Sequence, residues 1–157
     1  MRRLLFVCLG NIIRSPLAEH LFSDRASRAG VAGNYTVDSA GTAGWHSGES
    51  PDPRMVQTAK QHGLTLGGTA RQVRSDDLES FDLILAMDES NRQALLKLAR
   101  TPEQRGKIRL LREFDPQRGD SDVPDPWYGG QDGFQQTYQI IERSVRGLLE
   151  TLERGQA

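Results

Sequence analysis

Short apolar runs alternate along the chain with longer segments in which apolar residues recur every three or four positions. Four of these runs predict buried β-strands, because each is short and bounded by polar residues or glycine. They cover residues 4–7, 35–37, 81–87 and 108–111.

The segments between the runs have the periodicity of amphipathic helices. We expect helices over residues 16–29, 53–62, 89–99 and about 134–152. Pro16 suits a first helical turn, and Gly63 suits a helix end. Strands that alternate with helices predict an α/β fold with a parallel sheet.

Two stretches have neither pattern. Residues 39–52 are rich in Gly and Ser, and residues 112–133 contain three prolines and a Gly-Gly pair. Loops at the carboxyl ends of parallel strands build the binding site in folds of this class. Loops this long are usually functional, so we expect the site there.

Composition narrows the class of protein. The chain has 157 residues, which predicts a single domain over residues 1–157. The net charge of −1 gives no support to nucleic-acid binding through overall positive charge. The longest apolar run, residues 4–9, is too short for a membrane span and leads into no cleavage site. We therefore expect a cytoplasmic protein without nucleic-acid or membrane partners.

The sequence contains few candidate metal ligands of the cysteine and histidine type. Its single cysteine, Cys8, allows neither an internal disulfide nor a cysteine-rich zinc site. The three histidines, His20, His46 and His62, are not paired at metal-ligand spacing. We expect no metal, and we interpret the histidines as ordinary surface or partly buried residues.

The segment Val-Cys-Leu-Gly-Asn-Ile-Ile-Arg-Ser-Pro, residues 7–16, carries the strongest chemical signal. Gly10 and Asn11 tolerate left-handed backbone, so a tight turn can follow the strand. Such a turn directs backbone N–H groups inward, and the following helix adds its positive dipole end. The segment therefore predicts an anion cradle of phosphate size.

Cys8 lies at the floor of this predicted cradle. Positive surroundings favour the thiolate, which is the nucleophilic form. Arg14 can bind two phosphate oxygens with its planar guanidinium, and Ser15 can hydrogen-bond the thiolate. A lone cysteine at a strand end is usually inert packing, but strand, glycine turn, Arg-Ser-Pro and helix together favour a site. The nucleotide-binding motifs GxxxxGK[ST] and GxGxxG are absent here.

A second candidate group lies in residues 120–130. A thiolate that attacks a phosphate ester needs an acid for the leaving oxygen and then a base for water, and one carboxyl group can serve both steps. Asp125, between two prolines, suits that role, and Asp122 is a competing acid. The alternative without catalysis is that this segment is a proline-rich turn on the surface. Trp127 and Tyr128 suit the walls of a pocket for an aromatic substrate.

Together these residues closely resemble the low-molecular-weight protein tyrosine phosphatase family. The resemblance rests on residues 8–15 and 125–128, on residues 38–42 with Trp45 and 50–53, and on residues 81–88. It implies hydrolysis of phosphotyrosine through a cysteinyl phosphate, with no cofactor. It further implies a phosphotyrosine protein as substrate, a tyrosine kinase in the same pathway, and a monomer or weak dimer.

The resemblance also implies residue roles. Cys8 would be the nucleophile, Arg14 the phosphate ligand, and Asp125 the general acid and then base. The phosphate loop and its support would comprise Leu9, Gly10, Asn11, Ile12, Ile13, Ser15 and Ser39. The pocket walls would comprise Leu9, Ile12, Trp45, Trp127 and Tyr128.

Two positions depart from the family pattern. Ile13 stands where members usually carry a second cysteine, and Gly68 stands where several carry a histidine that supports the loop. Asp88 either supports the site or begins the helix over residues 89–99.

We thus expect a four-stranded parallel sheet of order 2-1-3-4 with helices on both faces, a flavodoxin-like three-layer architecture. The loop after Cys8 should lie at the carboxyl end of the central strand. Three alternatives stay open: an arsenate reductase, which normally uses additional cysteines; a protein-arginine phosphatase, which resembles this loop but has a small polar residue at the position of Ile12; and a catalytically weak phosphoprotein-binding module.

Overall fold

Four parallel strands form one sheet in the computed structural model, which describes residues 1–117 and 119–155. The strands are β1 (Arg2–Cys8), β2 (Tyr35–Gly41), β3 (Leu83–Ala86) and β4 (Ile108–Leu110). Their order is β2-β1-β3-β4, and every neighbouring pair is parallel. The predicted order 2-1-3-4 is confirmed.

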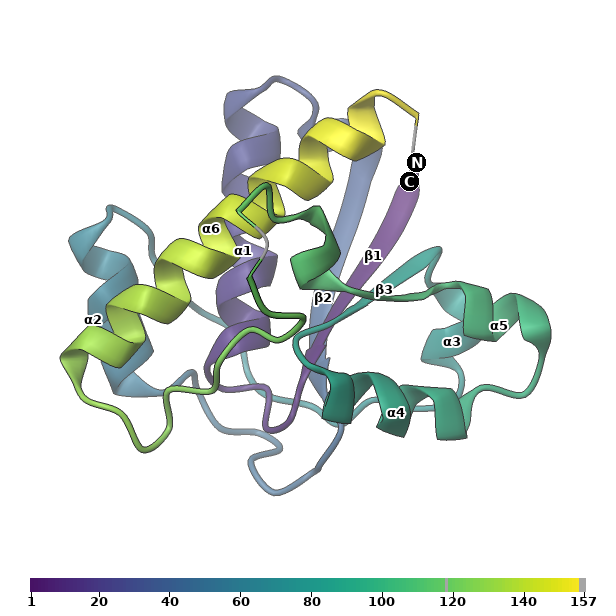
Figure 1. Cartoon of the computed structure of the whole chain (residues 1–157), viewed down its shortest axis with the longest axis horizontal. Helices are drawn as coiled ribbons and strands as arrows, with labels where there is room; N and C mark the ends of the chain where they lie inside the picture. Colours follow the sequence, from purple (N-terminus) through teal and green to yellow (C-terminus); the bar gives the residue numbers. More distant parts are fainter. Residues whose placement is uncertain (118, 156–157) are drawn as a thin grey trace.

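Helices cover both faces of this sheet. They are α1 (Arg14–Arg28), α2 (Pro53–Gln61), α3 (Asp77–Ser80), α4 (Glu89–Leu98), α5 (Pro102–Gly106) and α6 (Gln131–Glu153), with 3₁₀ turns η1 (Ala32–Asn34) and η2 (Leu111–Phe114). Helices α1, α2 and α6 lie on one side of the sheet, and α3, α4 and α5 on the other (Figure 1). The three-layer α/β architecture is therefore also confirmed.

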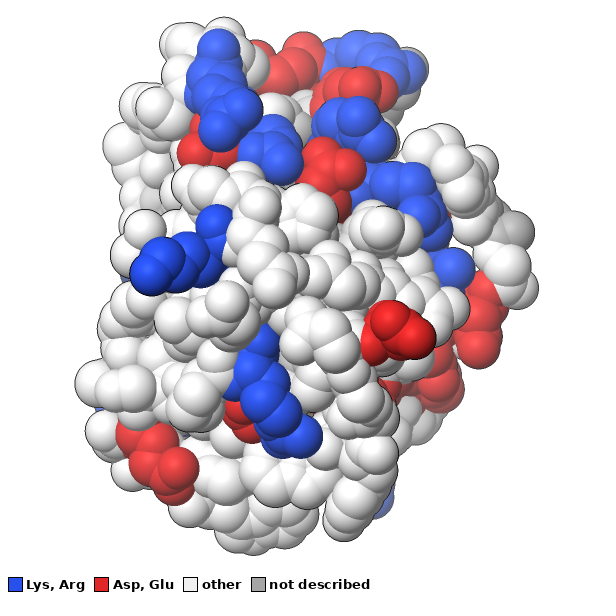
Figure 2. Space-filling model, turned by 90° about the vertical axis from the view of Figure 1, so that its left-hand side faces the viewer, with Lys and Arg blue, Asp and Glu red and all other residues white. Residues whose placement is uncertain are grey.

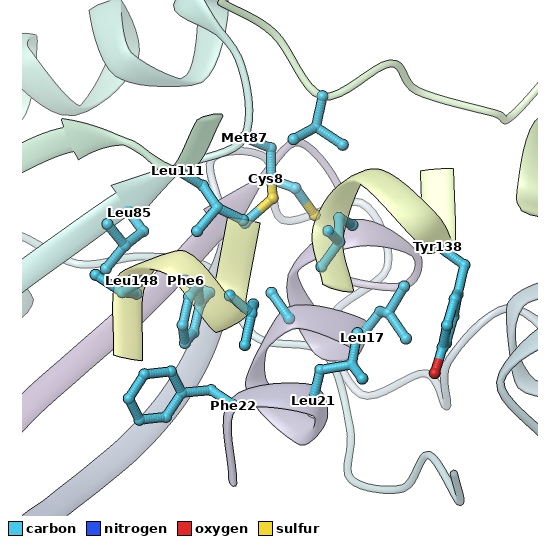
Figure 3. Packing of buried hydrophobic residues seen from close by; sticks show 14 of the residues in the cluster. Phe6, Cys8, Leu17, Leu21, Phe22, Leu85, Met87, Leu111, Tyr138 and Leu148 are labelled. Carbon is cyan, nitrogen blue, oxygen red and sulfur yellow. The ribbon is translucent and has the colours of Figure 1, made fainter. Parts of the chain in front are cut away.

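Strand β1 is buried on both faces, which explains its uninterrupted apolar run. Leu4 and Phe6 pack into the cluster formed with α1 and α6, which Figure 3 shows from close by. Leu5 and Val7 point to the opposite face and pack with residues such as Ile84 of β3. The end of this central strand is thus fixed from both sides.

Several element bounds differ from the sequence prediction. Strand β2 continues to Gly41, because Ser39, Ala40 and Gly41 pair with the last residues of β1 although they lack an apolar pattern. Strand β3 is shorter than residues 81–87, and Leu111 belongs to η2 rather than to a strand. Helices α3 and α5 are too short to show a helical period in the sequence.

The irregular segment after β4 is tied to α6 by close packing and by charge. A Cβ on Gly147 of α6 would lie 1.9 Å from the carbonyl oxygen of Phe114, so only glycine allows this approach. The buried Asp115 carboxylate accepts hydrogen bonds from Arg112 at 3.2 Å and from Arg143 of α6 at 3.2 and 3.3 Å. These contacts anchor one end of the segment that leads to Asp125.

The charges on the face seen in Figure 2 are of mixed sign. Blue and red side chains gather together at its upper end, and the lower half carries few of them. This face therefore offers no continuous basic surface. Within residues 1–117 and 119–155, no helix combines the length and the apolar character needed to cross a membrane.

Candidate active site

The chain turns from β1 into α1 at the carboxyl end of the sheet, and Cys8 is the last residue of the strand. Its side chain is buried, beside Met87 in the close-up of the core (Figure 3). The Cys8 carbonyl oxygen accepts a hydrogen bond from Thr42 N at 2.9 Å, and the Val7 carbonyl oxygen accepts one from Met87 N at 3.0 Å. Both neighbouring strands thus hold the cysteine in place.

Asn11 holds the turn that follows. It has left-handed backbone, with φ of 60°. Its Nδ2 donates hydrogen bonds to Ser15 Oγ at 2.8 Å and to Ser39 Oγ at 3.0 Å, while its Oδ1 accepts one from Arg71 N at 2.9 Å. One side chain therefore ties the turn to the start of α1, to β2 and to the segment at residue 71.

The Cys8 sulfur has two hydrogen-bond partners at its end of the turn. The backbone N–H of Asn11 donates to Sγ at 3.3 Å, and Ser15 Oγ lies 3.0 Å from it. Ser15 Oγ accepts from Asn11, and its own hydrogen can point to the sulfur, at 3.0 Å, or to the Ala40 carbonyl oxygen, at 3.5 Å. Two groups that can donate a hydrogen bond therefore lie beside the sulfur.

Gly10 has a different reason for being glycine from the one the sequence suggested. Its backbone is not left-handed. A Cβ there would lie 2.9 Å from Cδ2 of His46, so a larger residue would push that ring away. Close approach, rather than backbone freedom, explains this glycine.

Arg14, the first residue of α1, is buried beside the cysteine. Its Nη1 donates to Asp88 Oδ2 at 2.8 Å and to the Val123 carbonyl oxygen at 2.9 Å, and its Nη2 lies 3.6 Å from Asp125 Oδ2. Burial alone would lower the pKa of Arg14, but the negative charges of Cys8, Asp88 and Asp125 raise it above its usual value. The guanidinium stays charged and fixed in direction.

Asp88 serves both roles that the sequence left open. Its Oδ2 binds Arg14, while its Oδ1 accepts a hydrogen bond from Asn91 N at 2.7 Å and so caps α4. The residue thereby orients the arginine from a rigid helix start.

Of the two candidate acids, Asp125 lines the pocket. Its Oδ1 accepts a hydrogen bond from Trp127 N at 3.1 Å, and its Oδ2 faces Arg14. Asp122 instead accepts a hydrogen bond from Glu89 N at 2.9 Å, at the start of α4. The geometry therefore favours Asp125 as the group that can exchange a proton with a molecule in the pocket.

The pocket above the sulfur has a volume of about 430 Å³. Its lining comprises Cys8, Leu9, Gly10, Ile12, Ile13, Arg14, Trp45, His46, Asp125, Trp127 and Tyr128. Arg14 and Asp125 are the charged residues of this lining, and most of the other side chains are apolar or aromatic. This arrangement fits an aromatic group that carries an anion at its tip.

The structure brings together all the residues that the sequence assigned to the pocket, and it places Asn11, Ser15 and Ser39 behind the loop. Three neighbours were missed. His46 lines the pocket, although the sequence suggested an ordinary residue; its position next to Trp45 in the Gly- and Ser-rich stretch was the available signal. Arg54 and Arg71 bind the site from distant segments, and no local pattern marks them.

A small cavity of about 140 Å³ lies behind the loop, and its lining includes Gly68, the position at which the family resemblance led us to expect a histidine. Ser39 Oγ donates to Glu19 Oε1 at 2.6 Å beside this cavity. Burial raises the pKa of Glu19, and the hydrogen bond from Ser39 only partly opposes this. The bonds from Asn11 to both serines form without any side chain at residue 68.

Metal ligation has no support in the ranges 1–117 and 119–155, where no three His, Cys, Asp or Glu side chains are grouped closely enough to hold an ion. The positive groups at the pocket floor are Arg14 and the first turn of α1. The N-cap residue of that helix, Ile13, makes no side-chain cap, so its first backbone N–H groups can bind an anion.

Comparison with known proteins agrees with this geometry. Residues 3–157 match the family described as low molecular weight phosphotyrosine protein phosphatase. The low molecular weight protein-tyrosine-phosphatase of Streptomyces coelicolor is 46% identical over 94% of this chain and 91% of its own length. The low molecular weight phosphotyrosine protein phosphatase of Homo sapiens is 40% identical over 95% of this chain and 94% of its own. A crystal structure of a protein tyrosine phosphatase from Entamoeba histolytica has a TM-score of 0.96 and 37% identity and covers 100% of both chains.

Proposed function

The chain belongs to the low molecular weight phosphotyrosine protein phosphatase family, and we propose that it hydrolyses phosphotyrosine in proteins, and small aryl phosphates, through a cysteinyl phosphate. The observation that carries the proposal is the position of Cys8 Sγ at the floor of an aromatic-walled pocket beside Arg14 and Asp125.

In the first step, Cys8 Sγ forms a bond to phosphorus while the bond from phosphorus to the phenolic oxygen breaks. The electron pair of the broken bond stays on the phenolic oxygen, which takes the proton held by Asp125. Arg14 and the backbone N–H groups at the start of α1 stabilise the negative charge on the phosphoryl oxygens. Those fixed positive groups let the reaction proceed without a metal ion.

In the second step, the Asp125 carboxylate takes a proton from water as the water oxygen bonds to phosphorus. The sulfur–phosphorus bond breaks, its electron pair returns to Cys8, and inorganic phosphate leaves. Hydrogen bonds from Asn11 N and Ser15 Oγ stabilise the departing thiolate.

Pocket shape favours phosphotyrosine over other phosphorylated residues. The aromatic walls fit a phenyl ring, and phosphoserine is too short to bring its phosphorus to Cys8. The buried, apolar Ile12 in the lining disfavours the polar guanidinium of phosphoarginine. An arsenate reductase cycle would need further cysteines, and the sequence contains one.

The test is turnover of p-nitrophenyl phosphate with EDTA present, comparing the parent chain with Cys8→Ser and Asp125→Ala. We expect turnover by the parent, none by Cys8→Ser, and a loss of about 100-fold or more for Asp125→Ala. A parent that binds vanadate but never turns over would instead indicate a phosphoprotein-binding module.

Phosphopeptides test the substrate class. Peptides that differ only in phosphotyrosine, phosphoserine or phosphoarginine should be hydrolysed in that order of preference, with phosphotyrosine far ahead. Efficient release of phosphate from phosphoserine or phosphoarginine would contradict the proposed role of the aromatic walls and Ile12.

The cellular setting follows from the same chemistry. A phosphotyrosine substrate requires a tyrosine kinase that forms it, and a free nucleophilic Cys8 requires a reducing compartment such as the cytoplasm. We propose a monomer or weak dimer, because the exposed Trp45, Trp127 and Tyr128 could pack against a second copy. Size measurement over a dilution series distinguishes the two states.

A further inference from the structure

Arg54, the second residue of α2, lies between the two loops that carry the chemistry of the site. The residue before the helix, Asp52, donates its backbone N–H to the carbonyl oxygen of Ile12 at 2.8 Å and so joins α2 to the Cys8 loop. Arg54 Nη1 donates to the carbonyl oxygen of Trp127 at 2.8 Å and so joins α2 to the Asp125 loop.

The guanidinium is itself held in one orientation. Its Nε and Nη2 donate to the two carboxylate oxygens of Asp52 at 3.1 and 2.8 Å, which is a bidentate pair. Its Cζ lies 5.2 Å from the ring centroid of Trp127 and 4.8 Å from that of Phe134, within the range of cation–π contacts. Burial would raise the pKa of Asp52, but the hydrogen bonds from Arg54 lower it, so both partners remain charged.

Trp127, whose carbonyl oxygen Arg54 binds, also contacts the acid through its own N–H. The N–H of Trp127 donates to Asp125 Oδ1, and its carbonyl oxygen accepts from Arg54. On the other side of Asp125, the chain is fixed by Val123, whose N–H donates to the Met87 carbonyl oxygen at 2.8 Å. Arg54 therefore anchors the part of the loop that follows Asp125.

We propose that Arg54 is a positioning residue for the reaction: together with Asp52 it fixes the Asp125 loop at the distance from the Cys8 loop that proton transfer to the leaving oxygen requires. The inference rests on the proposed function, since it assumes that Asp125 is the general acid. Arg54 does not line the pocket, so the proposed role involves no direct contact with the substrate.

A general acid matters most when the leaving oxygen is strongly basic, and this gives a test that a purely structural role would not pass. The measurement is kcat/KM, which reports steps up to the first irreversible one, for phenyl phosphate and for p-nitrophenyl phosphate. Phenolate is much the more basic leaving group of the two. The proteins compared are the parent, Arg54→Met, Arg54→Lys, Asp125→Asn and Arg54→Met/Asp125→Asn.

We expect Arg54→Met to lower kcat/KM about tenfold for phenyl phosphate and less than about threefold for p-nitrophenyl phosphate. The tenfold loss is a part of the rate enhancement of about 10²–10⁴-fold that a general acid contributes. Arg54→Lys keeps the charge but lacks the planar fork, so it should show a smaller loss of the same kind. Adding Arg54→Met to Asp125→Asn should cause no further loss on phenyl phosphate. Arg28→Met, which removes an exposed ion pair with Asp24, is the matched control and should leave both rates unchanged.

Equal losses on both substrates, or a further loss in the Asp125→Asn background, would overturn the proposal. If Arg54→Met does not fold, as judged by circular dichroism, Arg54→Lys carries the same comparison. An unchanged leaving-group dependence in Asp125→Asn would reject Asp125 as the acid and with it the proposed mechanism. If kcat/KM depends steeply on the leaving group in Asp125→Asn but Arg54→Met behaves like the parent, only the role of Arg54 is rejected.

Discussion

Asn11 shows how much one side chain can determine at a catalytic turn. It adopts left-handed backbone and ties three segments together. Left-handed backbone costs an L-residue with a Cβ about 1–2 kcal/mol, and asparagine is among the residues that tolerate it. The position therefore demands both a backbone conformation and an amide group.

Two substitutions separate these demands. Asn11→Ala and Asn11→Gly both remove the amide, so both should lower kcat for p-nitrophenyl phosphate by at least about tenfold, the equivalent of 1.4 kcal/mol. Only Asn11→Gly keeps an easy left-handed backbone, so it should be more stable than Asn11→Ala by about 1 kcal/mol in urea unfolding. Equal stability of the two variants would show that backbone conformation contributes little here.

Ile13 should determine how the site responds to oxidation. Peroxide converts a thiolate to a sulfenic acid, which a neighbouring thiol can trap as a disulfide before further oxidation. Ile13 lines the same pocket as Cys8 and offers no thiol. We expect that dithiothreitol restores only part of the activity after peroxide treatment, and that Ile13→Cys restores more.

The measurement for Ile13 is recovered activity together with the mass of the peptide that contains Cys8. Sulfinic or sulfonic acid should accumulate in the parent and a disulfide in Ile13→Cys. Complete recovery of the parent with dithiothreitol would contradict the prediction.

At the scale of elements, the contact between α6 and η2 is unusually close. A Cβ at Gly147 would lie 1.9 Å from the carbonyl oxygen of Phe114, which is backbone and cannot rotate away. Gly147→Ala should therefore destabilise the protein by at least about 2 kcal/mol in chemical unfolding. Gly133→Ala in the same helix meets only a Pro126 carbon at 3.9 Å and should stabilise by about 0.5–1 kcal/mol.

The same two elements are joined by a buried carboxylate whose effect depends on pH. Burial would raise the pKa of Asp115, but hydrogen bonds from Arg143, Gln117 N and Arg112 bring it below its ordinary value. A carboxyl group whose pKa is lower in the folded state stabilises the fold when the pH is above its pKa in the unfolded state. This stabilisation is lost as the pH falls through its pKa in the folded state. Asp115→Asn should cost about 3 kcal/mol at pH 7, and the difference from the parent should shrink below about pH 4. A constant difference across this range would count against the ion pair.

The elements that the sequence predicts well are those whose burial is set by their own pattern. Strand β1 and helix α6 are examples, since each has apolar residues at the spacing of its own secondary structure. The second half of β2 was not predictable, because Ser39 and Gly41 are held by pairing with β1 rather than by apolar character. Arg54 and Arg71 were missed for a similar reason: their partners are distant in sequence and are brought near only by folding.

At the scale of the whole molecule, chemistry is concentrated at one end of the sheet. The loops after β1 and β2 and the segment after β4 all contribute to one pocket, as expected for parallel strands whose carboxyl ends share an edge (Figure 1). The sequence predicts which residues gather there because each lies just beyond a predicted strand or in a long irregular loop. The distances among these residues are not predictable in this way. They depend on the packing of α2, as do the contacts by which Asp52 and Arg54 join the Cys8 loop to the Asp125 loop.

Both tryptophans of the chain, Trp45 and Trp127, line this pocket, with relative exposures of 74% and 37%. The intrinsic indole fluorescence of the protein therefore originates at the mouth of the site, and no tryptophan elsewhere adds background. A titration with vanadate should change its intensity or emission wavelength, and Trp45→Phe and Trp127→Phe should divide that change between the two walls. The fold thus provides a label-free optical reporter of ligand occupancy.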